Sequence, residues 1–163
     1  PAQFHDPADT RSMLAEVADL EPDDNVDFVA VPQLASVLVY SDSVGGTLPR
    51  VVSEMVQTRD GTKVRPLPEV WFMLAGLESI AEYNKIVASY MDGWLHLVIA
   101  QGRTLLLCNA FAAPDFTTAE YFLFLAMKRL QLNPEMSVVY FRTPLEEEDE
   151  ISLYRYFKGV ERI

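Results

Sequence analysis

A run of acidic residues is the feature of this sequence that comes closest to metal-binding chemistry. Residues 146–150 are all Asp or Glu, and clustered carboxylates can bind a divalent cation. The run also precedes a segment carrying Arg155, Lys158 and Arg162, which places acids at the start of a predicted helix and bases towards its end, as the helix dipole favours. We therefore interpret the run as the solvated start of a helix and predict no metal site.

Histidine and cysteine chemistry has little support from the surrounding residues. Neither His5 nor His96 has a nearby Ser, Cys or Asp that would complete a triad or a metal site. His96 alternates with Leu95 and Leu97 on a predicted strand, so it should face away from them. Cys108 lies in an apolar run and is interpreted as a buried, small hydrophobic residue. A single cysteine cannot form an internal disulfide, which fits a reducing compartment such as the cytoplasm.

Glycines mark two places where a backbone could approach an anion. Gly45-Gly46 precedes a helix predicted to begin near Thr47, but the flanking residues do not match a phosphate-binding loop, so we interpret the pair as a turn. Asp92-Gly93 lies between two apolar runs and predicts a tight hairpin, because glycine accepts a positive φ without steric cost.

The elements that would position these residues follow from periodicity. In the second half, three consecutive strands are predicted, followed by a helix, a strand and a final helix: residues 86–91, 94–100, 103–110, 117–132, 137–142 and 151–162. Thr117 and Glu120 form a predicted capping box at the start of the first of these helices. The first half predicts a helix, two strands, a helix, a strand and a helix: residues 8–20, 26–31, 36–40, 48–57, 62–67 and 68–83.

Alternating strands and helices indicate an α/β protein with mixed sheets flanked by helices. A three-strand meander followed by helix, strand and helix is the ribonuclease-H-like order. The aromatic cluster of Tyr121, Phe122 and Phe124 is interpreted as core, with a partner-binding surface as the alternative.

Composition excludes several classes of partner. The chain has 163 residues, of which 50% are hydrophobic, enough for a substantial core. The formal net charge of -11 argues against nucleic acid and against an anionic membrane surface, because both need a basic face. No apolar run reaches the ~18–20 residues that a membrane-spanning helix needs, and no signal peptide is recognised.

Several segments resemble a bacterial family of unknown function found mainly in Bacteroidetes, domain of unknown function 3822. The family pattern is a glycine, a leucine-rich strand, Asn-(Ser/Thr/Ala)-Phe, and then an acidic residue and an aromatic pair that open a helix. The matching residues here are Gly102, Leu105-Leu106-Leu107, Asn109-Ala110-Phe111, Glu120 and Tyr121-Phe122. Residues 32–40 and 153–157 are also similar to family segments.

This resemblance implies an actin-like ATPase fold with two ribonuclease-H-like lobes. Residues 1–84 would be the remainder of the first lobe (αββαβα), and residues 85–163 the second lobe (βββαβα). Longer family members have further strands before the position of Pro1, so the chain is expected to lack the front of its first lobe. Such a truncation would leave sheet edges exposed, which predicts a protein partner or self-association, with a homodimer as one form.

The resemblance also implies where a nucleotide would bind. The second phosphate-binding hairpin corresponds to residues 91–96, where Asp92 and Gly93 fit the expected pattern, while Trp94 and Leu95 replace the expected Gly, Ser or Thr. The adenosine-binding turn would follow residues 138–142, and the Thr143–Glu146 segment there has no glycine pair. We therefore expect a degenerate nucleotide site, no bound cofactor and a non-catalytic scaffold or interaction protein. The alternative is an actin-like ATPase or phosphotransferase that binds ATP and Mg²⁺.

Overall fold

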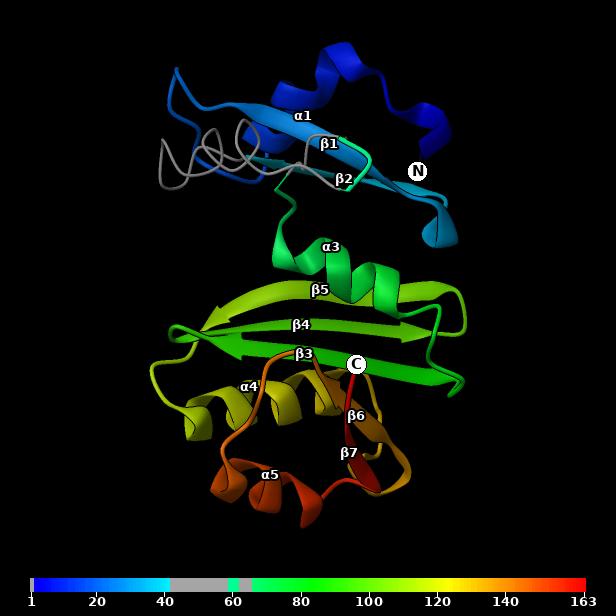
Figure 1. Cartoon of the computed structure of the whole chain (residues 1–163), viewed down its shortest axis with the longest axis vertical. Coiled ribbons are helices and arrows are strands. Elements are labelled where there is room, and N and C mark those ends of the chain that lie inside the picture. Colours follow the sequence, from blue (N-terminus) through cyan, green and yellow to red (C-terminus); the bar gives the residue numbers. More distant parts are fainter. Residues whose placement is uncertain (1, 42–58, 62–65) are drawn as a thin grey trace. The chain divides into compact units, whose positions relative to one another are not determined.

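The predicted meander is present in the computed structural model, which describes residues 2–41, 59–61 and 66–163 (Figure 1). Contacts divide the chain into two compact units, Pro1–Trp71 and Phe72–Ile163. Each unit is described by itself. The predicted helix over residues 48–57, the Gly45-Gly46 turn and most of the predicted strand over residues 62–67 lie outside the described residues.

The first unit contains a helical segment followed by a β-hairpin. Its elements are η1 (Ala2–Phe4), η2 (Pro7–Asp9), α1 (Thr10–Ala15), β1 (Val26–Val31), η3 (Pro32–Leu34) and β2 (Ser36–Ser41). β1 and β2 pair antiparallel, which confirms both predicted strands. Asp6 caps η2, because its Oδ1 accepts a hydrogen bond from the Ala8 N–H at 2.9 Å. The helix predicted over residues 8–20 is too long, because α1 ends at Ala15. Val17 is 82% exposed, so extending the helix to bury this side chain would bring no gain in buried apolar surface.

The second unit is built on a mixed sheet. Its described strands are β3 (Asn84–Met91), β4 (Trp94–Gln101), β5 (Thr104–Ala112), β6 (Val138–Phe141) and β7 (Gly159–Arg162). They lie in the order β5-β4-β3-β6-β7, with β3, β4 and β5 antiparallel and with β6 and β7 parallel to β3. The first strand of the meander is therefore central, as in a ribonuclease-H-like sheet, and the meander supplies one edge.

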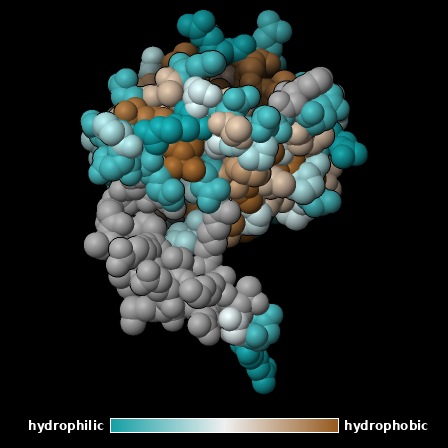
Figure 2. Space-filling view, turned by 90° about the horizontal axis from the view of Figure 1, so that it is seen from above, coloured by the Kyte–Doolittle hydropathy of each residue, from teal (hydrophilic) through white to brown (hydrophobic). Residues whose placement is uncertain are grey.

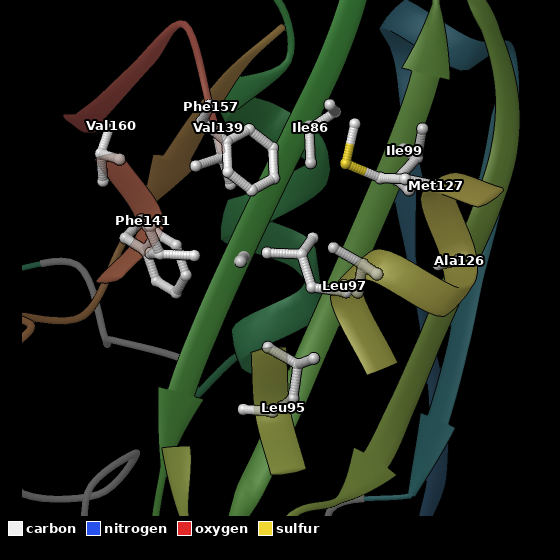
Figure 3. Close-up of a cluster of buried hydrophobic side chains, with 14 of the residues drawn as sticks. Ile86, Leu95, Leu97, Ile99, Ala126, Met127, Val139, Phe141, Phe157 and Val160 are labelled. Atoms are coloured by element: carbon white, nitrogen blue, oxygen red, sulfur yellow. The ribbon is translucent and has the colours of Figure 1, made fainter. Parts of the chain in front are cut away.

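Helices cover both faces of this sheet. α4 (Phe116–Arg129) and α5 (Glu147–Tyr154) follow β5 and β6, while α3 (Glu69–Gly76) precedes β3 and is drawn on the opposite side of the sheet from α4 (Figure 1). Figure 3 shows the core between the sheet and α4, where Leu95, Leu97 and Ile99 of β4 meet Met127. On the other face, Val87 and Val98 are also fully buried, so the central strands are apolar on both sides.

Three predictions near the ends of helices are wrong. The final helix was predicted over residues 151–162, but α5 ends at Tyr154 and β7 follows, because Val160 and Phe157 pack into the sheet core. The cap of α4 is Asp115, whose Oδ1 accepts a hydrogen bond from the Thr118 N–H at 2.7 Å, in place of the predicted Thr117–Glu120 box. The predicted helix over residues 68–83 is also shorter, since α3 ends at Gly76.

Polar and apolar side chains are interspersed on the face drawn in Figure 2. No helix among the described residues is long and apolar enough to cross a membrane.

Candidate functional site

The turn between β3 and β4 holds the two residues predicted to contact phosphate. Met91 pairs with Trp94, so Asp92 and Gly93 form a two-residue loop. Their φ angles are 52° and 76°, the positive values that a type I′ turn requires at both positions. The Gly93 carbonyl accepts a hydrogen bond from the Ala113 N–H at 2.7 Å. The hairpin is confirmed, and a role of these residues in phosphate binding stays a prediction.

The polar groups of Tyr90, two residues before Asp92, are bonded within the protein. The Tyr90 N–H donates to Thr143 Oγ1 at 2.9 Å, and the Tyr90 hydroxyl donates to the Ala113 carbonyl at 3.1 Å. Thr143 is the first residue of the predicted adenosine-binding turn, and its hydrogen bond with Tyr90 links the segment after β6 to β3. Ligands of open α/β sheets bind at the carboxyl ends of parallel strands, and these hydrogen bonds occupy that position between β3 and β6.

Carboxylates and the cations Arg142 and Arg162 both lie at this end of the sheet. Burial raises the pKa of Tyr90, and the negative charges of Asp115 and Asp149 raise it further. Burial raises the pKa of Asp149, and its acidic neighbours Glu146 and Glu148 add to this effect. Acids from the starts of two helices therefore act on one tyrosine at the end of β3.

The acidic run over residues 146–150 is the start of a helix, as predicted: α5 begins at Glu147 and has four acids in its first turn. Beside it, a cavity of about 240 Å³ lies at the ends of β6 and β7, where Thr143, Glu150 and Glu161 are among the lining residues. Among the described residues, no group of three His, Cys, Asp or Glu side chains could hold a metal ion.

The two histidines and the cysteine are not among the residues that line the cavity at the ends of β6 and β7. His5 Nε2 lies 3.1 Å from Thr10 Oγ1, and its ring packs on Phe28. His96 is half-buried and lies opposite Ser89, whose fully buried hydroxyl has no hydrogen-bond partner among the described residues. Cys108 is exposed, contrary to the prediction, because β5 is an edge strand.

A groove between β5 and α4 is a second candidate, about 270 Å³ in volume. Its apolar lining includes Leu107 and Phe111 from the strand and Phe122 from the helix, and the two phenyl rings stack at 4.8 Å. Asn109 and Arg129 are its polar lining residues. The sequence left Phe122 as either a core residue or part of a partner surface. Among the described strands, β5 pairs only with β4, so no further strand lies next to the groove.

Comparisons identify the family and the fold. The family model described as "Protein of unknown function (DUF3822)" matches residues 1–160, so the chain belongs to this family. A solved structure from Bacteroides thetaiotaomicron, described as a protein with actin-like ATPase fold and unknown function, matches with a TM-score of 0.68 at 14% sequence identity. The match covers 100% of this chain and 63% of that chain. No curated protein matches the sequence. The predicted family and the predicted actin-like, ribonuclease-H-like fold are both confirmed.

Proposed function

We propose that this protein is a non-catalytic scaffold or interaction protein whose actin-like fold carries a degenerate nucleotide site. The observation that supports this proposal most is the set of acids at the starts of α4 and α5, of which Asp115 and Asp149 act on Tyr90, two residues before Asp92. Helix N-termini attract anions, and a phosphate could be held by those of α4 and α5. Here Asp115 already accepts the Thr118 N–H, and four acids fill the first turn of α5. A polyphosphate would meet carboxylates at both helices.

A protein partner or self-association, with a homodimer as one form, follows from this proposal. The net charge of -11 disfavours nucleic acid and anionic membranes as partners. The single cysteine supports a cytoplasmic location.

Nucleotide titration tests the proposal directly. The protein is titrated with ATP in the presence and absence of Mg²⁺ and followed by calorimetry and thermal denaturation. We expect no heat of binding and no shift of the melting temperature up to millimolar nucleotide. Saturable binding that requires Mg²⁺ would contradict the degenerate site. Light scattering over a range of protein concentrations tests the homodimer, and a monomer throughout the range would exclude it.

The second candidate is an ATP-binding phosphotransferase or ATPase of the actin-like class. The observation in its favour is the Asp92-Gly93 turn itself, which has the backbone geometry and the carboxylate of a phosphate hairpin. Asp92→Asn keeps a residue that tolerates a positive φ while it removes the charge. Under this candidate, Asp92→Asn would abolish nucleotide binding, whereas Asp23→Asn, an exposed control in the first unit, would leave it intact.

A further inference from the structure

The β5 strand has one free edge among the described residues. Its other edge pairs with β4, and the Ala113 N–H donates to the Gly93 carbonyl just beyond the strand. Because N–H groups alternate in an antiparallel ladder, Phe111 and Asn109 also point towards β4, while Cys108, Ala110 and Ala112 point outwards. The Ala110 N–H donates a hydrogen bond to Asn109 Oδ1 at 2.9 Å, which agrees with an outward direction and means that this donor is bonded within the chain.

This edge lacks the features that usually block strand addition. From Thr104 to Ala112 the strand contains no charged residue and no proline, and it is long enough to template another strand. Its one irregularity is a bulge opposite Ile99 and Ala100, near its beginning. The segment from Leu107 to Ala112 is therefore regular in register, and an added strand would replace the Asn109 side chain as the partner of the outward Ala110 N–H.

The groove between β5 and α4 runs beside the same edge. Leu107, Asn109 and Phe111 alternate along the strand and line the groove, and Phe122 and Leu125 line it from the helix. An extended segment paired with β5 would point every second side chain towards α4, because side chains alternate between the faces of a sheet. Backbone pairing would supply affinity, and the apolar groove would select the alternate side chains.

Charge decides between the possible occupants. Arg129 lines the groove at the last turn of α4, and no ion pair or hydrogen bond of Arg129 is found in the described part of the chain. A second copy would bring an uncharged β5 and no carboxylate from that strand to Arg129, and each copy carries a net charge of -11. A foreign segment with a carboxylate would satisfy the guanidinium through a charge-assisted hydrogen bond.

We propose that the β5 edge and the β5–α4 groove bind an extended peptide segment of another protein, with apolar side chains at alternate positions and a carboxylate next to Arg129. This inference rests on the proposed function, for which it supplies the binding surface. The groove lies within the second unit and uses none of the residues of the Asp92-Gly93 turn. Nucleotide binding and peptide binding can therefore succeed or fail independently.

The test uses an array of heptapeptides that alternate Thr with Val, Ile, Leu or Phe and carry Glu at either end. A matched array carries Lys in place of Glu. Binding of the full chain to the best peptides is then measured by fluorescence anisotropy. We expect saturable binding that concentrates in the Glu array, and a salt dependence that reflects the ion pair. Equal binding to both arrays, or binding to neither, would overturn the proposal.

Backbone methylation separates strand pairing from simple apolar adsorption. N-methyl groups at alternate positions of a peptide remove its N–H donors along one edge only. Peptides are methylated either at the odd or at the even positions. We expect one of these two sets to lose binding and the other to keep it, since only one edge of the peptide faces β5. If both sets bind equally, the segment does not pair with the strand. This control needs no protein variant and holds even where a substitution disturbs folding.

Two neighbouring cations provide a matched pair of protein variants. Arg129→Glu should weaken binding of the Glu peptides about tenfold or more, because it replaces attraction by repulsion. Lys128→Glu makes the same charge change at an exposed position that does not line the groove, and should change affinity less than about twofold. Equal effects of the two variants would overturn the role of Arg129. A dimer that Ala110→Pro converts to monomer would instead identify a second copy as the occupant.

Discussion

The hydrogen bond between Tyr140 and Glu82 predicts how the second unit responds to alkaline pH. The Tyr140 hydroxyl donates to Glu82 Oε2 at 2.8 Å, and the tyrosine is 9% exposed. Burial, followed by the hydrogen bond and the charge of Glu82, raises the pKa of Tyr140 to about 12 from its ordinary value of 10.0. Tyr140→Phe removes both the ionisable group and the hydrogen bond, so the difference between the variant and the native protein isolates this contact.

The sign and size of the effect follow from linkage. A raised folded-state pKa means that the unfolded chain ionises first, so the stabilisation is complete below about pH 10 and is lost as the pH approaches about 12. At about pH 9 the native protein should exceed Tyr140→Phe by about 1 kcal/mol in free energy of unfolding, from the hydrogen bond. Between about pH 9 and about pH 11.5 this difference should decrease by about 2 kcal/mol, at 1.36 kcal/mol per unit of pKa shift.

Urea denaturation at a series of pH values, followed by far-ultraviolet circular dichroism, measures these free energies. Tyr83→Phe is the matched control, since it makes the same substitution at a tyrosine that is 70% exposed. Glu82→Gln should reduce the loss, because it removes the charge that opposes ionisation of Tyr140. A stability difference between the native protein and Tyr140→Phe that stays constant, or grows, from about pH 9 to about pH 11.5 would refute the reasoning.

Three further substitutions test the packing and the turns of the second unit. Leu97→Ala, at a side chain with 0% exposure, should cost about 3 kcal/mol in urea denaturation, whereas Leu105→Ala, at 39% exposure, should cost less than about 1 kcal/mol. Similar costs would contradict the assignment of the core. Asp115→Ala should destabilise the start of α4, and Asp115→Asn should do so much less, because Asn still caps the helix; hydrogen exchange at the start of α4 reports the difference. Gly93→Ala should lower the melting temperature by the equivalent of about 1 kcal/mol through its φ of 76°, and an unchanged melting temperature would exclude backbone strain at the turn.

Local patterns predicted most of the fold because they report burial directly. The Asp92-Gly93 pair and its flanking apolar runs fixed the β3–β4 hairpin, and both predicted strands of the first unit are present. The final helix was mispredicted because Val160 and Phe157 fit a helical period as well as a strand. Tertiary packing against β6 decided between the two states.

The features of the candidate site were harder to predict because they depend on contacts between distant parts of the chain. Nothing in the sequence pairs Tyr90 with Thr143, or brings Asp115 and Asp149 to act on the same hydroxyl. Cys108 was misassigned for a related reason. An apolar strand has the same sequence pattern at the centre of a sheet and at its edge, and only the order of the strands distinguishes the two positions.

Local charge, more than net charge, should decide which ligands the second unit accepts. At the carboxyl end of β3, the unit's own acids occupy the helix N-termini that would attract phosphate, and removing Asp115 alone would leave the first turn of α5 acidic. At the β5 edge the strand is uncharged and the nearest lining charge is the cation Arg129. An acidic peptide is repelled by the protein as a whole, yet within a Debye length of the groove it meets a positive charge. We expect added salt to weaken peptide binding to the native protein, because Arg129 is the charge nearest to the peptide carboxylate, and to strengthen binding to Arg129→Glu, where only repulsion remains.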